Sequence, residues 1–218
     1  MRRRGFSAGA AIVSSLMFGS VSSSARSVGV ECSPDTIHVD IGLAEDGSFL
    51  DMGKCLGQTF YAADTVISRI RVWRLALNQP NVSPMKMWIT TVNEYGRPLT
   101  DGVIREGPVV QVIYGDGVHH TPIDFDFDPP VVLPIRGRYA FFVQQICTGF
   151  FSIMVSLHDV YPDGIAWLTD RSQYAGCFLA SGPDGFVDAD MIFDVVFCDT
   201  KTTDTKRKSW GQVKTIYR

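Results

Sequence analysis

One stretch near the middle of the chain, residues 121–146, constrains the fold more than any other. It begins with three large apolar residues that alternate with three aspartates, in the order Ile123, Asp124, Phe125, Asp126, Phe127 and Asp128. A period of two places the apolar side chains on one face of a strand and the carboxylates on the other. The pattern therefore predicts a half-buried β-strand whose carboxylates form a solvated stripe that protects a sheet edge.

The residues that follow predict a second strand. Pro129 and Pro130 cannot donate backbone hydrogen bonds, so we expect them to end the first ladder. A turn is expected at Arg136-Gly137, and residues 139–146 then read as the next strand.

Similar segments recur every 8 to 15 residues or so, separated by turns rich in glycine, proline and aspartate. None shows helical periodicity over three turns. The chain is therefore predicted to be all-β, an antiparallel β-sandwich of jelly-roll-like form. Residues 67–75 and 85–92 read as a strand pair with a wide loop. The other expected strands are 57–61, 109–114, 150–157, 165–168 and 191–198.

Length and composition fit one core domain. The 218 residues carry a net charge of -3, which gives no electrostatic reason to expect nucleic acid as a partner. We expect a signal peptide at 1–25, an irregular lead-in at 26–54, the sandwich at 55–198 and a flexible tail at 199–218.

The first 25 residues have the three parts of a secretory signal. Arg2, Arg3 and Arg4 are followed by a modestly apolar run, and small residues precede a cleavage point near Ala25. The predicted location is secreted, either extracellular or periplasmic, with no integral membrane segment in the mature chain. An uncleaved anchor and a twin-arginine signal, suggested by Arg3-Arg4-Gly5-Phe6, are the alternatives.

All five cysteines follow the expected cleavage point, where an oxidising compartment favours disulfides. If the first and last core strands are antiparallel neighbours, Cys55 and Cys198 meet at one end and are expected to pair. Cys147 with Cys177 is the second expected pair, which leaves Cys32 over.

Several short motifs resemble a group of secreted bacterial jelly-roll domains described as galactose-binding-like or carbohydrate-binding-like. The resemblance covers about 55–198 and implies the fold, together with a place in larger surface proteins. The motifs are Gly57-Gln58-Thr59-Phe60, Asp124-Phe125-Asp126-Phe127 with its proline pair, Gly137-Arg138-Tyr139-Ala140-Phe141, Tyr174-Ala175-Gly176 and Asp194-Val195-Val196-Phe197. Cys177 and Phe178 interrupt the family's glycine and serine pattern near Tyr174.

Aromatic residues are the candidate ligand-binding groups. Trp73 and Trp88 fall on the polar faces of strands expected to pair, so they could form a platform that stacks on sugar rings, or they could be covered by a loop. Trp167, Tyr161 and Tyr174 lie in late, glycine-rich connections of the kind that carry ligand loops in sandwiches.

Aspartates form a second set of candidates. Asp184, Asp188 and Asp190 crowd one turn, and oxygen ligands on an irregular loop suit a structural Ca²⁺ ion. Capping of the turn's own backbone is the simpler interpretation.

No nucleophile elbow, phosphate loop or dinucleotide motif occurs, and His119-His120 lacks an evident catalytic partner. We therefore expect a non-catalytic secreted binding module for a glycan or another cell-surface component. A structural or adhesive protein that makes only protein contacts is the alternative, and a glycan-active hydrolase is a third, less favoured one. The C-terminal residues 209–218 could dock to a sorting or attachment partner, or simply fray.

Overall fold

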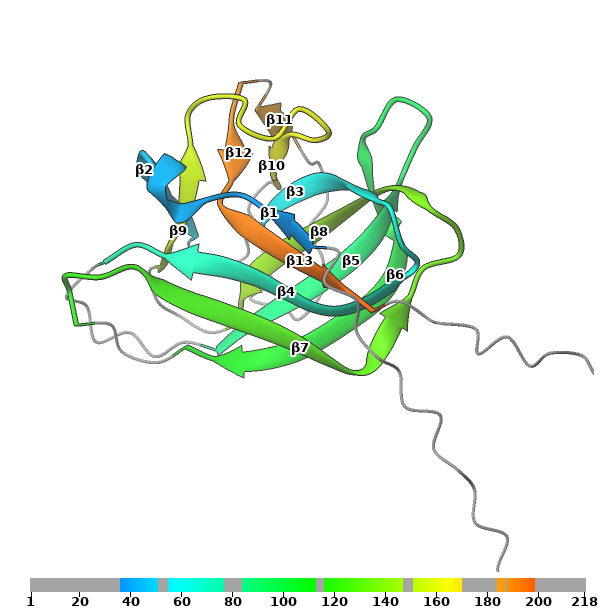
Figure 1. Ribbon diagram of the computed structural model, residues 1–218, viewed down its shortest axis with the longest axis horizontal. Helices are drawn as coiled ribbons and strands as arrows, with labels where there is room; N and C mark the ends of the chain where they lie inside the picture. The colour runs from blue at the N-terminus through cyan, green and yellow to red at the C-terminus, as the bar shows by residue number, and fades with distance from the viewer. Residues whose placement is uncertain are drawn as a thin grey trace, which may run out of the picture.

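The computed structural model describes residues 36–50, 55–76, 84–112, 116–146, 151–169, 184–186 and 188–198. These residues form an all-β sandwich of two antiparallel sheets, as the alternation predicted (Figure 1). Within these ranges there is no α-helix, so none of them contains a helix of the length and hydropathy that a bilayer crossing requires.

One sheet has seven strands, with β4 at its centre. β4 pairs with β13 on one side and with β7 on the other, and β1 extends the sheet beyond β13. The smaller strands β2, β9 and β12 join past the end of β4. The bounds are β1 Thr36–His38, β2 Asp46–Leu50, β4 Val66–Arg74, β7 Thr121–Val132, β9 Phe151–Ser156, β12 Asp190–Met191 and β13 Phe193–Phe197.

The second sheet has six strands in the order β11-β10-β3-β8-β5-β6. Their bounds are β3 Cys55–Ala62, β5 Pro84–Val92, β6 Pro98–Gln111, β8 Gly137–Gln145, β10 Ala166–Leu168 and β11 Asp184–Phe186. A single 3-10 turn, η1 Ile41–Leu43, links β1 to β2 within the described residues.

The main core lies between the sheets and follows the predicted alternation. Ile123, Phe125 and Phe127 of β7 are buried in it, as expected from the opening pattern. β8 differs because it is apolar on both faces. Phe141 packs into the main core, whereas Phe142 belongs to a smaller buried cluster on the opposite face of the six-stranded sheet.

Two predictions about strand ends and partners are wrong. Segments 67–75 and 85–92 do form strands, β4 and β5, but these belong to different sheets. Pro129 and Pro130 do not end β7, which continues to Val132. They are accommodated because β7 pairs only with β4 among the described strands and because the register shifts between Ile67 and Arg69.

The predicted Cys55–Cys198 disulfide is also wrong. Cys55 carries a buried thiol at the start of β3, while the Cys198 N–H donates to Val66 O beyond the other end of that strand. At roughly 3.3 Å per residue, β3 separates the two ends by about 23 Å, whereas a disulfide needs Cα atoms within about 7 Å. Cys32, Cys147 and Cys177 lie outside the described residues, so the second pairing stays a prediction.

Candidate functional site

A pocket of about 270 Å³ opens at one end of the six-stranded sheet. Its floor comes from three neighbouring strands, and the turn between β5 and β6 forms one wall. Tyr61 faces away from the main core, because its neighbours Phe60 and Ala62 are the residues of β3 that are buried there. We call this site the Tyr61–Arg138 pocket; it is lined by Tyr61, Val92, Asn93, Glu94, Gly96 and Arg138.

The wall of the pocket is a turn whose shape is held by hydrogen bonds of its own residues. The Asn93 side-chain oxygen accepts the N–H groups of Tyr95 and Arg97 at 3.0 and 2.9 Å. The Asn93 N–H donates to Arg97 O at 2.9 Å, and Gly96 adopts a left-handed φ of 79° that favours glycine. The wall is therefore formed before any ligand arrives.

The pocket combines an aromatic ring with a cation and an anion. Tyr61 is 48% exposed and lies directly opposite Arg138 in the β3–β8 ladder. Arg138 and Glu94 are both exposed, and the Arg138 side chain forms no hydrogen bond or ion pair with the described residues. A flat ring next to guanidinium donors and carboxylate acceptors can stack on a ring-shaped ligand and hydrogen-bond its polar groups.

Tyr161, a predicted ligand-binding residue, instead holds the strand that carries Tyr61. Its hydroxyl oxygen accepts the Tyr61 N–H at 3.1 Å, and its ring stands edge-on to Phe193 with centroids 5.3 Å apart. Burial raises the pKa of Tyr161, which keeps the hydroxyl protonated. Tyr161 therefore supports the strand that carries Tyr61 and is not among the described lining residues of the pocket.

Asp190, a predicted calcium ligand, is buried and accepts hydrogen bonds from protein groups. One carboxylate oxygen accepts the N–H groups of Val160 and Tyr161 at 2.9 and 2.8 Å. The other accepts the Gln58 side-chain amide at 2.7 Å. Burial raises the pKa of Asp190, although these hydrogen bonds oppose the rise.

The other two members of the predicted calcium set differ from this buried carboxylate in their exposure. Asp184 and Asp188 are exposed. The described ranges contain no group of three or more His, Cys, Asp or Glu side chains placed to hold a metal ion. Calcium binding stays a prediction.

The platform predicted from Trp73 and Trp88 is not formed. Trp73 lies in β4 and Trp88 in β5, so the two residues belong to different sheets. Both are less than one-tenth exposed. Trp73 stacks under the Arg71 guanidinium at 5.9 Å, and Trp88 lies under the Lys86 ammonium at 4.8 Å.

The structure brings Trp88 together with another predicted residue, Trp167. Both belong to the smaller buried cluster, which also contains Phe142, on the outer face of the six-stranded sheet. Strand registers place them in one row that crosses five strands: Trp88, Phe142, Gly57, Trp167 and Gly185. Tyr174, the remaining aromatic candidate, lies outside the described residues.

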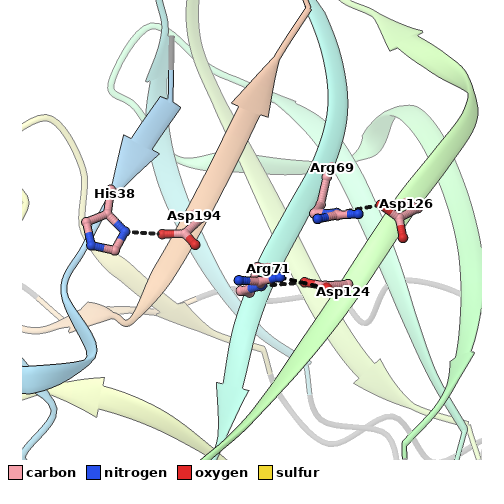
Figure 2. A network of polar contacts seen from close by, with 6 residues as sticks. All are labelled: His38, Arg69, Arg71, Asp124, Asp126 and Asp194. Atoms are coloured by element: carbon pink, nitrogen blue, oxygen red, sulfur yellow. Dashed lines mark hydrogen bonds and ion pairs between the residues drawn. The ribbon is translucent and has the colours of Figure 1, made fainter. Parts of the chain in front are cut away.

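The aspartates of β7 meet arginines of β4 across the seven-stranded sheet (Figure 2). Arg71 makes a two-pronged contact with Asp124 at 2.5 and 2.8 Å, and Arg69 contacts Asp126 at 2.5 Å. The hydrogen bond from Arg71 lowers the pKa of Asp124. Asp124 and Asp126 thus form ion pairs that the sequence did not predict, while Asp126 and Asp128 are exposed as expected.

The histidine pair has two separate roles. His119 contacts the Asp116 carboxylate at 2.6 Å, which lowers the pKa of Asp116 well below its usual value. The His120 ring accepts the Ala76 N–H at 3.2 Å. Neither contact forms a catalytic arrangement with a nucleophile.

The Tyr61–Arg138 pocket is not predicted by the sequence, although signals for its parts are present. Asn93 and Gly96 mark a tight turn, and Arg138 lies inside a motif that carries the family resemblance. What the sequence lacks is a signal that Tyr61 of one strand faces Arg138 of another.

Comparisons with known proteins add little to this site. The sequence matches no protein-family model and no curated protein. Among solved structures, the cysteine protease and lectin-like domains of Cwp84, a surface layer associated protein of Clostridium difficile, superpose with a TM-score of 0.38 at 10% identity. That match covers 71% of this chain and 36% of the Cwp84 chain, so this chain corresponds to about a third of its length.

Proposed function

We propose that the chain is an exported, non-catalytic binding domain that holds a carbohydrate in the Tyr61–Arg138 pocket. The observation that carries this proposal is the placement of a half-exposed tyrosine ring opposite an arginine, inside a preformed pocket. Export is inferred from the basic, apolar and small-residue segments at 1–25.

The pocket's chemistry suits a sugar ring. Sugars present apolar C–H faces and several hydroxyl groups, so they need a flat surface together with donors and acceptors. Tyr61 supplies the surface, Arg138 the donors and Glu94 the acceptors. Small-molecule sites are usually about 300–1,000 Å³, so a pocket of about 270 Å³ suits one ring rather than a long chain.

The same composition favours binding over hydrolysis. Most glycosidases place two carboxyl groups on either side of the bond that they cleave. The described lining of the pocket contributes one carboxylate, Glu94. It therefore provides a hydrogen-bond acceptor without a described partner for acid–base chemistry.

A glycan array probed with the folded chain tests the proposal, and the affinity for any captured glycan is then measured by calorimetry. Tyr61→Ala and Arg138→Gln should each weaken binding by about tenfold, since an aromatic contact or a charged hydrogen bond contributes about 1.4 kcal/mol. Tyr95→Ala is the matched control, because Tyr95 lies on the same turn, is 85% exposed and is absent from the described lining.

Two results would contradict the proposal in different ways. Binding that survives both substitutions would show that the glycan site lies elsewhere on the molecule. An unaltered chain that captures no glycan would remove the carbohydrate ligand and favour an adhesive protein that makes only protein contacts. In either case the denaturant midpoints of all variants should match, so that misfolding is not mistaken for lost binding.

A further inference from the structure

A second pocket of about 180 Å³ lies at the open end of the sandwich, between the sheets. Leu56 and Ala166 reach it from the core-facing side of the six-stranded sheet. Val155 and Gly47 reach it from β9 and β2 of the other sheet. Tyr61 faces the opposite side of β3, so the two pockets are separate.

Small side chains create this hollow. Ala166 and Ala189 line it where larger residues would complete the core, whereas a Cβ at Gly47 would clash with the Ser152 hydroxyl. The Ala166 N–H donates to Ala189 O at 2.9 Å, which holds two of these residues together. An engineered apolar cavity of about 150 Å³ is large enough to bind benzene, so the volume here accepts a group of that size.

Polar residues lie at the opening of the pocket, and contacts of Glu45 fix their position. Asp46 is the one charged residue among the described lining residues, and it is exposed. Beside it, the Glu45 carboxylate accepts the Leu157 N–H at 2.9 Å and pairs with His158 at 3.2 Å. These contacts fix the rim between β2 and the end of β9, and they leave Leu157 54% exposed at the opening.

We propose that this pocket binds an apolar ring-sized group that carries a cationic substituent, with the ring between the sheets and the cation next to Asp46. The apolar lining excludes a charged group from the interior, because burying an unpaired charge is costly. The carboxylate at the mouth attracts a cation there and repels an anion. The proposal concerns a different face from the sugar site and stands independently of it.

Titration of the full chain with toluene, benzylamine and benzoate, followed by amide NMR spectra, tests the proposal. We expect saturable shifts centred on the amides of Gly47, Val155 and Ala166. Benzylamine should bind roughly fivefold more tightly than toluene, because two opposite charges 4 Å apart in water attract each other by about 1 kcal/mol. Benzoate should bind more weakly than toluene, because its charge has the same sign as that of Asp46. Shifts that do not saturate, or that centre elsewhere, would overturn it.

Two kinds of variant separate the pocket from its charge. Ala166→Val and Ala189→Leu each fill part of the hollow, so each should weaken toluene binding at least tenfold while the spectrum stays dispersed. Asp46→Asn should remove the preference for benzylamine over benzoate and leave toluene binding unchanged. Toluene binding that persists in both filled variants, or a charge preference that survives in Asp46→Asn, would contradict the assignment.

Discussion

Gln58 and Asp190 join the two sheets through hydrogen bonds in the buried interior. Gln58 belongs to β3 and Asp190 to β12, on opposite layers. The Gln58 amide donates to the Asp190 carboxylate at 2.7 Å, and its carbonyl oxygen accepts the Met191 N–H at 2.8 Å. Because Asp190 also binds the N–H of Tyr161, this contact connects the sandwich interior to the back of the Tyr61–Arg138 pocket.

Replacing Gln58 by leucine should destabilise the fold by about 2 kcal/mol. The change leaves one Asp190 oxygen and the Met191 N–H buried without their partner, and an unsatisfied buried group costs about 1–3 kcal/mol. Urea denaturation measures the loss. Asp188→Asn is the control, because Asp188 is exposed nearby and should change stability by less than about 0.5 kcal/mol. Equal stability of the Gln58 variant and the wild type would show that the contact contributes nothing.

The free energy of unfolding should fall as pH rises from 3.8 to the folded pKa of Asp190. Burial raises its folded pKa above the ordinary 3.8, so between these values the folded chain keeps a proton that the unfolded chain releases. The contribution is fully present below 3.8 and is lost as pH rises through the folded pKa. The difference in stability between wild type and Asp190→Asn should therefore shrink or reverse over that window. A difference that is flat from pH 3 to 8 would contradict the shift.

Asp124 should show the opposite pH dependence. The Arg71 hydrogen bond lowers its folded pKa below 3.8, so its stabilisation is present above 3.8 and is lost as pH falls through the folded value. At neutral pH, Asp124→Asn should cost about 1 kcal/mol, less at high salt, since the pair is partly exposed. Asp128→Asn serves as the control from the same strand. Equal losses in both variants would show that the ion pair has no specific role.

Replacing Gly57 by alanine should destabilise the smaller cluster on the outer face of the six-stranded sheet. A Cβ at Gly57 would clash with the Phe142 ring and come within 2.5 Å of the Phe141 carbonyl oxygen, and the backbone atom cannot move aside cheaply. We expect a loss of about 1–3 kcal/mol in urea denaturation. Gly42→Ala is the comparison, because its nearest new contact is an Asp40 side-chain oxygen at 3.2 Å.

Periodicity predicted which residues face the core but not which strands are neighbours. The alternation in β7 correctly identified Phe125 as buried, because side-chain direction depends only on local strand geometry. The same pattern could not show that β4 and β5 lie in different sheets, since the pairing is decided by packing across the whole sandwich.

The candidate site was harder to predict for the same reason. Asn93 and Gly96 are residues typical of turns, whereas the pocket depends on Tyr61 and Arg138 meeting across a ladder. The sequence pattern favoured Trp73 and Trp88 as exposed aromatic residues, but both are buried, beneath the guanidinium of Arg71 and the ammonium of Lys86.

The three prolines of β7 have a consequence for behaviour at high concentration. Pro122, Pro129 and Pro130 lie in a strand that pairs only with β4 among the described elements. Successive residues of a strand direct their N–H groups to opposite sides, so one of the adjacent Pro129 and Pro130 removes a donor from the side that faces away from β4. A continuous intermolecular ladder along this side is therefore interrupted there. We therefore expect the sandwich to resist strand-to-strand polymerisation along β7, an open border of the seven-stranded sheet.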